Sequence, residues 1–326
     1  MKLIGRVSLL MSVACVVFAI PVASAPAALP ELGRCVQSTP TMEGKRKKFS
    51  GKFRNKTCTK TAPAGDGHWE WSPGPGETKT YEDLGATAAV KLETTSGAQI
   101  ACADHKLRGE YTGPTTQTAS LTLFECVETA TNEPCETIDT SETPPTYTNG
   151  LITSQALEAE LGHVGTAHKK PLSGWDFKPK AGNDMFVFEC AEIPSVSAPS
   201  EPPTVPTEPP ALPTEPPAGL SASKASSAQS AESASDLIGL GNKYVVEGSF
   251  IEPVLEPRAS KMTPEFIEAA TASKGVQQPE SFEGGATDTL MAEVITGVTP
   301  TTEAIGYSTG NERIANGEPL EIKSIP

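Results

Sequence analysis

Six cysteines outside the N-terminal apolar segment constrain the fold of this chain more than any other feature. They are Cys35, Cys58, Cys102, Cys126, Cys135 and Cys190. An even number of cysteines in an exported chain is typical of disulfides, here three, although sequence alone does not select among the pairings. We expect Cys35–Cys58, Cys126–Cys135 and Cys102–Cys190. A metal site is the weaker interpretation, because the sequence has no C-x-x-C motif and no paired Cys/His spacing.

Residues 1–27 have the three parts of a secretory signal peptide. Two basic residues precede an apolar stretch at 7–23, and a run of small residues follows. This order predicts cleavage after Ala25, Ala27 or Ala28 and a secreted or cell-envelope location. An uncleaved anchor and lipidation at Cys15 are the alternatives. No other stretch approaches the about 20 apolar residues of a membrane span, so we expect no span after processing.

The chain is acidic apart from one short basic stretch. Its net charge is −14, and loss of Lys2 and Arg6 with the signal peptide leaves 24 basic and 40 acidic residues, a charge of −16. This charge favours solubility and argues against nucleic acid as a partner. Residues 44–60 are the exception, since they hold eight basic residues and no acidic one: Lys45, Arg46, Lys47, Lys48, Lys52, Arg54, Lys56 and Lys60.

A proline-rich segment separates two β-rich parts of the chain, residues 28–193 and residues 237–326. Residues 194–236 contain a seven-residue repeat built on Glu-Pro-Pro, followed by a Ser/Ala-rich run. Proline at this density predicts an extended polyproline II spacer, and the Ser/Ala run has nothing apolar to bury. We therefore expect a disordered insertion, with the two β-rich parts packed together.

Short strands between Gly- and Pro-containing turns dominate both parts. The expected strands are 88–93, 98–102, 119–126, 158–162, 175–178, 185–190, 243–251, 289–294, 302–307 and 320–323. In 119–126, Leu121 and Leu123 should face one way and Ser120 and Thr122 the other. This spacing predicts an all-β fold, an antiparallel sandwich or a barrel-like structure. Residues 265–274 fit a helix or a strand equally.

Six short motifs occur in order along the chain. They are PELGRC at 30–35, GEYTGP at 109–114, LEAELG at 157–162, FVFEC at 186–190, VEGSFI at 246–251 and PESFEGG at 279–285. As a set they resemble a family of exported, cysteine-containing β-rich proteins of unknown function from soil actinobacteria. The resemblance implies that residues 194–236 are an insertion between two neighbouring strands of one fold, which loop-closure entropy tolerates. It implies no activity.

Two segments are candidate ligand-binding surfaces. Trp69 and Trp71 would face the same side of a strand, as in a platform for a sugar ring, with packing into the core as the alternative. The basic stretch is a candidate anion-binding surface for an anionic cell-wall polymer or nucleic acid. The alternatives are a solvated hairpin closed by Cys35–Cys58 and contact with the acidic remainder of the same molecule. Its candidate residues are Lys45, Arg46, Lys47, Lys48, Lys52 and Arg54.

No pattern in the sequence predicts catalysis. The four histidines, His68, His105, His163 and His168, have no acidic partner at a diagnostic spacing, and G-x-S-x-G and H-E-x-x-H motifs are absent. We therefore predict no catalytic residue, no metal and no cofactor. The leading interpretation is a non-enzymatic, secreted or envelope-associated structural or binding protein. The alternatives are a cell-wall glycan-binding module and an extracellular hydrolase whose site has no recognisable motif.

Overall fold

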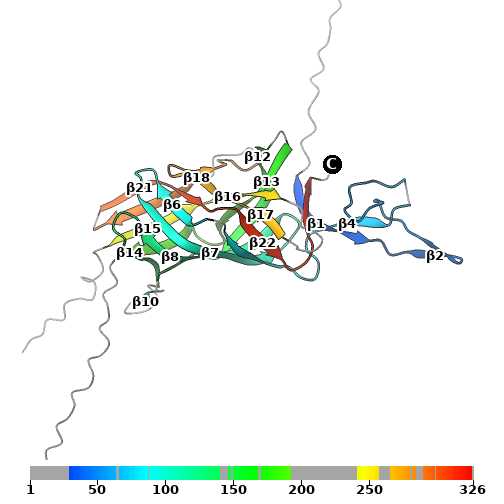
Figure 1. Cartoon of the computed structure of the whole chain (residues 1–326), viewed down its shortest axis with the longest axis horizontal. Helices are drawn as coiled ribbons and strands as arrows, with labels where there is room; N and C mark the ends of the chain where they lie inside the picture. Colours follow the sequence, from blue (N-terminus) through cyan, green and yellow to red (C-terminus); the bar gives the residue numbers. More distant parts are fainter. Residues whose placement is uncertain are drawn as a thin grey trace, which may run out of the picture.

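In the computed structural model of the chain, regular structure in the described residues is entirely β (Figure 1). The structure describes residues 29–63, 66–86, 88–139, 146–147, 150–167, 170–191, 241–256, 265–279, 281–283, 289–297 and 299–324. The predicted signal peptide, Cys15, His168 and the proline-rich insertion lie outside the described residues. In the part of the chain that is described, no helix is long and apolar enough to cross a membrane.

The observed strands confirm the predicted all-β fold class. They are β1 (Pro30–Gln37), β2 (Thr41–Glu43), β3 (Arg46–Lys48), β4 (Trp69–Pro73), β5 (Thr80–Ala86), β6 (Val90–Thr94), β7 (Gln99–Tyr111), β8 (Thr116–Glu128), β9 (Cys135–Asp139), β10 (Thr146–Tyr147), β11 (Leu151–Thr153), β12 (Leu157–Ala167), β13 (Lys170–Pro179), β14 (Asp184–Cys190), β15 (Asn242–Gly248), β16 (Phe250–Glu256), β17 (Glu265–Glu268), β18 (Thr271–Ser273), β19 (Val276–Gln278), β20 (Leu290–Thr296), β21 (Thr299–Ser308), β22 (Glu312–Asn316) and β23 (Glu321–Ser324). Each of the ten expected strands overlaps one of these. The helix considered for 265–274 is wrong, because β17 and β18 occupy that segment.

Eight antiparallel strands close into a barrel. Their order is β7-β5-β22-β17-β16-β13-β12-β8, and the pairing of β8 with β7 completes the ring. The barrel encloses large aromatic side chains that are almost fully buried, among them Tyr111, Trp175, Phe177 and Phe250. Closure pairs both edges of the sheet, so the barrel presents no free edge strand.

A second group of strands extends from the same β7–β8 hairpin. β6 pairs with the first half of β7, and the sheet continues outward through β21, β20, β15, β14, β9 and β10. β11 pairs with β8 on the other side of the hairpin. We call these strands, from β6 to β10 in this order together with β11, the extension. Strands from both sides of residues 192–240 pair within it, with Cys190 opposite Asn242.

The β7–β8 hairpin changes its buried face where the barrel meets the extension. Leu121 and Leu123 are buried while Ser120 and Thr122 are partly exposed, as predicted from their alternation. Beyond Glu125 the buried set shifts by one residue along β8, to Cys126 and Glu128. Glu125 has a φ of 52°, an unusual backbone conformation for a residue other than glycine. One hairpin therefore contributes buried side chains to both the barrel and the extension, whose apolar residues form one continuous cluster.

Two of the three disulfides follow the strand pairing rather than closeness in the sequence. Cys35–Cys58 forms as predicted. The expected Cys126–Cys135 and Cys102–Cys190 pairs are wrong, because the bonds are Cys102–Cys126 and Cys135–Cys190. In each of these two bonds the cysteines are direct partners in neighbouring strands, β7 with β8 and β9 with β14. Register thus places the correct sulfur atoms side by side.

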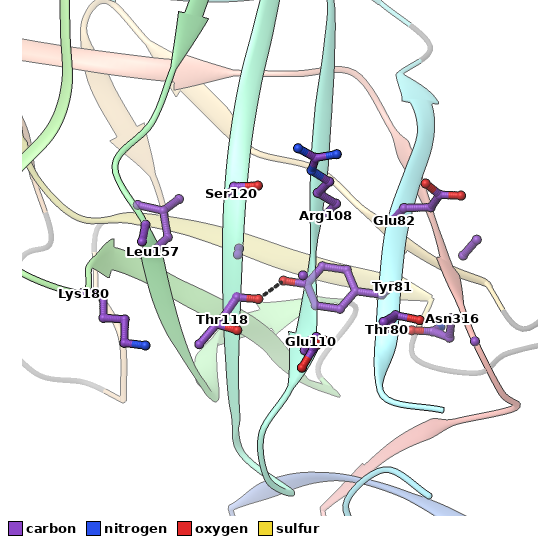
Figure 2. A pocket seen from close by; sticks show the side chains of 15 residues that line it. Thr80, Tyr81, Glu82, Arg108, Glu110, Thr118, Ser120, Leu157, Lys180 and Asn316 are labelled. Atoms are coloured by element: carbon purple, nitrogen blue, oxygen red, sulfur yellow. Dashed lines mark hydrogen bonds between the residues drawn. The ribbon is translucent and has the colours of Figure 1, made fainter. Parts of the chain in front are cut away.

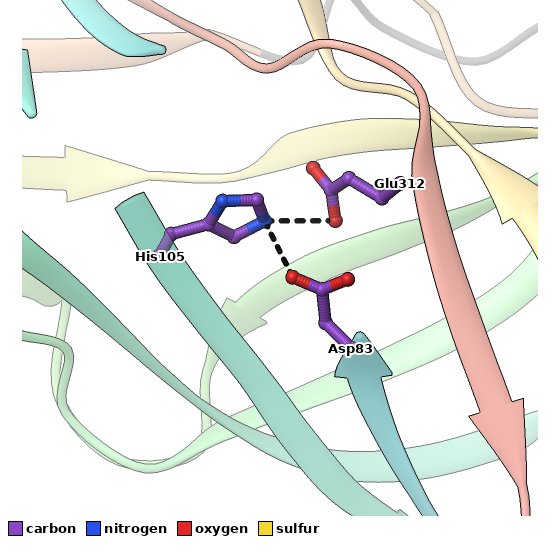
Figure 3. A group of neighbouring side chains, drawn as sticks. All are labelled: Asp83, His105 and Glu312. Carbon is purple, nitrogen blue, oxygen red and sulfur yellow. Dashed lines mark ion pairs between the residues drawn. The ribbon is translucent and has the colours of Figure 1, made fainter. Parts of the chain in front are cut away.

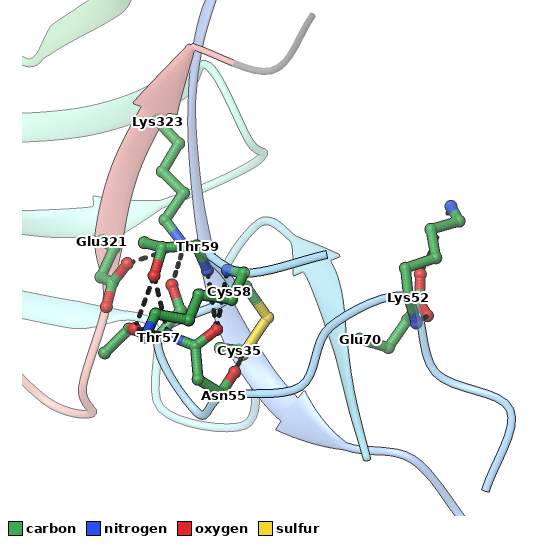
Figure 4. Close-up of a disulfide and its surroundings, with 10 residues drawn as sticks. Cys35, Lys52, Asn55, Thr57, Cys58, Thr59, Glu70, Glu321 and Lys323 are labelled. Carbon is green, nitrogen blue, oxygen red and sulfur yellow. Dashed lines mark hydrogen bonds and ion pairs between the residues drawn. A yellow bond between two sulfur atoms is a disulfide. The ribbon is translucent and has the colours of Figure 1, made fainter. Parts of the chain in front are cut away.

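Residues 30–73, which we call the arm, lie beyond one end of the barrel (Figure 1). β1 pairs with β23 on one side and with β4 on the other, and β2 and β3 form a separate hairpin. The Cys35–Cys58 disulfide ties β1 to a turn organised by Asn55, whose side-chain carbonyl accepts hydrogen bonds from the backbone of Thr59 (3.1 Å) and Lys60 (2.8 Å) (Figure 4). Lys323 Nζ donates to the Thr57 carbonyl oxygen at 2.5 Å, so β23 also supports this turn.

Candidate functional site

The basic residues predicted as an anion-binding surface all lie on the arm. Lys45, Arg46 and Lys47 are exposed around the β2–β3 turn, and Lys48 lies beside Glu43 at 3.1 Å. Lys52 pairs with Glu70 at 3.3 Å. Among the described residues no acidic side chain pairs with Lys45, Arg46, Lys47 or Arg54. The arm therefore presents positive charge that is not neutralised internally, on a chain of net charge −14.

Trp69 and Trp71 also lie on the arm, in β4, and both are partly exposed. The Trp71 indole N–H donates to the Glu31 carboxylate, and Lys323 Nζ lies 4.3 Å from the centre of the Trp71 ring. Trp71 therefore has a structural role between β1 and β23. Trp69 lies next to the disulfide-linked loop, where its backbone exchanges hydrogen bonds with Phe53, each of 2.9 Å. Of the two rings, Trp69 is the better candidate for stacking with a ligand.

A depression of about 830 Å³ lies over β5, β7 and β8 (Figure 2). Glu82, Arg108 and Lys180 are among its lining residues, and the Tyr81 hydroxyl donates to the Thr118 carbonyl oxygen at 3.2 Å. Tyr81 crosses β7 above Gly109, where an added Cβ would lie 2.6 Å from the hydroxyl oxygen. Position 109 therefore requires glycine for this close approach.

A cluster of buried ionisable side chains lies inside the barrel and was not anticipated from the sequence. Asp83 of β5, His105 of β7 and Glu312 of β22 point toward one another from three adjacent strands (Figure 3). His105 Nε2 lies 3.2 Å from Asp83 Oδ2 and 3.0 Å from Glu312 Oε2, and all three side chains are at most 1% exposed. We call these three residues the triad.

Two further acids extend the triad into the barrel. Glu268 of β17 is the direct cross-strand partner of Glu312, and Glu252 of β16 shares a carboxyl hydrogen bond with Glu312. Both glutamates are at most 2% exposed. The Trp175 indole N–H donates to Glu268, yet Oε1 of Glu268 and Oε1 of Glu252 have no hydrogen-bonding partner among the described residues. Four acids thus share the interior with one imidazole.

Burial and mutual repulsion favour the neutral forms of Asp83, Glu252 and Glu268. Burial raises the pKa of Asp83 to about 6, with a further contribution from the charge of Glu312. Burial, followed by the charge of Glu312, raises the pKa values of Glu252 and Glu268 well above their usual range. Burial alone would lower the pKa of His105, but its hydrogen bond to Glu312 and the charges of Glu312 and Asp83 outweigh that effect and raise it.

We expect the free energy of unfolding, measured in the presence of a chelator, to fall as the pH rises from about 4 to about 7. Unfolded Asp83 has a pKa of 3.8 and folded Asp83 a pKa of about 6, so the folded state binds more protons between these values. A shift of about two units corresponds to about 3 kcal/mol lost by pH 7. Glu252, Glu268 and His105 act in the same direction, because their pKa values are also raised.

Urea unfolding in the presence of a chelator, for the wild type and Asp83→Asn, measures this effect. Asparagine keeps the acceptor for the Gly85 backbone N–H, which lies 2.8 Å from Asp83 Oδ1, but does not titrate. The stability difference between the two proteins should change by about 3 kcal/mol across this pH range. A difference that does not vary with pH would contradict the proposed burial of an ionisable Asp83.

The other described histidines, His68 and His163, contact residues outside the triad. His163 of β12 donates its backbone N–H to the Glu283 carboxylate at 2.5 Å, and the His68 ring stacks on Phe49 at 4.0 Å between centroids. His168 lies outside the described residues. A search for His and acidic residues close in sequence could not have found the triad, since its members lie on β5, β7 and β22, which become neighbours only through strand pairing in the sheet.

Comparison of the chain with family models, with curated proteins and with solved structures gave no match. Membership of the exported actinobacterial family suggested by the six motifs therefore stays a prediction.

Proposed function

We propose that this chain is an exported binding protein, secreted or held in the cell envelope, whose arm contacts an anionic cell-wall polymer or glycan. The observation that carries the proposal is the exposed, largely unpaired positive charge of the arm. Opposite charges attract, so the basic arm draws an anionic polymer towards itself, while the acidic remainder of the chain favours solubility. The expected signal peptide and three disulfides support export, because disulfides persist in oxidising compartments.

The structure gives the arm properties suited to such contact. Its basic hairpin lies apart from the closed barrel, so a polymer can reach it without disturbing the hydrophobic core (Figure 1). The Cys35–Cys58 disulfide and the Asn55 turn hold the segment that follows the hairpin in one conformation (Figure 4). A preorganised surface loses less conformational entropy on binding. Trp69 offers a neighbouring aromatic surface for sugar rings.

The test is co-sedimentation of the full mature chain with purified, insoluble cell wall. Replacing Lys45, Arg46 and Lys47 together by glutamine removes three exposed charges. At about 1 kcal/mol for each cation near an anionic surface, binding should weaken about 100-fold. Wild-type binding should also weaken with added salt, because salt screens exposed charges.

Two variants distinguish specific binding from general charge effects. Lys79, Lys91 and Lys274 are exposed outside the arm, and their joint replacement by glutamine removes the same charge. This control should bind as the wild type does. Trp69→Ala reports on stacking independently of charge. Equal retention of the arm variant and the wild type would refute the proposal, and so would equal weakening by the arm and control variants.

A further inference from the structure

The acid-rich interior of the barrel has too little positive charge for the acids that it buries. Asp83, Glu252, Glu268 and Glu312 face a single imidazole, and no lysine or arginine is among the groups that influence the pKa values of the first three. Isolated buried carboxylates are strongly unfavourable unless they are paired, protonated or bound to a metal. Like charges directly opposite each other in a sheet, as Glu268 and Glu312 are, add to the cost.

The spacing of the triad matches that of metal ligands. Metal–nitrogen and metal–oxygen bonds of about 2.0–2.2 Å place neighbouring ligand atoms about 3.0–3.5 Å apart in octahedral or tetrahedral geometry. His105 Nε2 lies 3.2 Å from Asp83 Oδ2 and 3.0 Å from Glu312 Oε2, and the three ligand atoms all lie within 4.8 Å of one another. The spacing of each carboxylate oxygen from the imidazole nitrogen is thus compatible with one shared cation.

Two observations beyond the triad point to a cation. Oε1 of Glu252 and Oε1 of Glu268 are buried acceptors without a hydrogen-bonding donor in the described part of the chain. The carboxyl group of each side chain interacts electrostatically with Glu312. Asp83 and His105 also line a surface depression of about 520 Å³, together with Leu84, Gly85 and Lys106. The triad therefore belongs to the stretch of barrel wall that this depression overlies.

We propose that Asp83, His105 and Glu312 bind one divalent first-row transition metal, of the class of Zn²⁺ or Mn²⁺, with Glu252 and Glu268 adding negative charge around it. The imidazole nitrogen favours such ions over Ca²⁺ and Mg²⁺, which prefer sites made of oxygen alone. This site is independent of the proposed polymer-binding arm, so either proposal can fail without the other.

The test uses the full mature chain with its disulfides intact, unfolded in urea with chelator and refolded with Zn²⁺ or Mn²⁺. After desalting, elemental analysis should find one metal ion per chain, and the melting temperature should exceed that of the metal-free protein. Asp83→Asn, His105→Gln and Glu312→Gln each remove one ligand atom, and each should weaken binding at least tenfold. Refolding with Ca²⁺ or Mg²⁺ alone should leave the melting temperature unchanged.

Folding of the variants can be checked independently of metal. Asp83→Asn and Glu312→Gln remove a negative charge from a repulsive group, so both should fold and melt at or above the temperature of the metal-free wild type. Glu128→Gln is the matched control, because Glu128 is a buried acid of the extension that accepts a hydrogen bond from Tyr244 at 2.7 Å. It should retain full metal content.

Three outcomes would overturn the proposal. The first is recovery of folded wild type without bound Zn²⁺ or Mn²⁺ after refolding in either ion. The second is retention of metal by the three ligand variants at the wild-type level, which would place the ion elsewhere. Equal loss of metal in Glu128→Gln would show that uptake depends on overall stability rather than on the triad.

Discussion

Removal of the Cys135–Cys190 disulfide should lower the free energy of unfolding by about 4 kcal/mol. This bond closes the longest loop of the three, with a sequence separation of 55 residues against 23 and 24 for the others. In the chain-entropy description, a longer closed loop restricts the unfolded chain more, and this length corresponds to about 4 kcal/mol. Both cysteines are fully buried, so the change also removes packed sulfur atoms from the extension.

The measurement is urea unfolding of the Cys135→Ala/Cys190→Ala double variant. Cys35→Ala/Cys58→Ala is the matched control, which should lose about 3 kcal/mol on the same entropic ground. Its effect should be concentrated in the arm, because that bond links β1 to the Asn55 turn. A loss in the first variant no greater than that in the second would show that loop length does not govern these contributions.

Replacement of Trp175 by alanine should cost about 4 kcal/mol, or prevent folding at 37 °C. Trp175 is fully buried in β13, and its ring lies 5.9 Å from the Tyr111 ring between centroids. Truncation of a buried tryptophan typically costs about 3–5 kcal/mol through lost transfer energy and the cavity that remains. The variant also removes the indole N–H that donates to Glu268, which leaves that carboxyl group without this donor.

Trp175→Phe separates the two contributions in the same denaturation experiment. Phenylalanine keeps most of the aromatic packing but has no N–H, so its loss should be intermediate. Trp69→Ala, at a partly exposed position of the arm, should cost much less. If Trp175→Ala lay within about 1 kcal/mol of the wild type, Trp175 would not be a central packing residue of the barrel.

The strands were predictable because alternation is a local property of the sequence. Leu121 and Leu123 face the core, as their spacing indicates, and each predicted strand overlaps an observed one. The change of face at Glu125 was not predictable, since a positive φ at glutamate has no sequence signal comparable to glycine. The segment at 265–274 fitted two structures locally, and its pairing with β16 and β22 decides for a strand.

The disulfides and the triad could not be predicted because both depend on register between distant segments. Cys135 is close to Cys126 in sequence, yet it pairs with Cys190 because β9 lies beside β14. His105 meets Asp83 and Glu312 only where β7, β5 and β22 adjoin. The exposed candidates needed less information, since Trp69, Trp71 and the basic residues belong to one continuous stretch of chain.

The β7–β8 hairpin, which the barrel and the extension share, determines how this molecule should unfold. Separation of β7 from β8 would open the barrel and would also disrupt the strand on which β6 of the extension pairs. We therefore expect the barrel and the extension to unfold together in a single cooperative transition. A destabilising substitution in the barrel should therefore also destabilise the extension, and a destabilising substitution in the extension should destabilise the barrel.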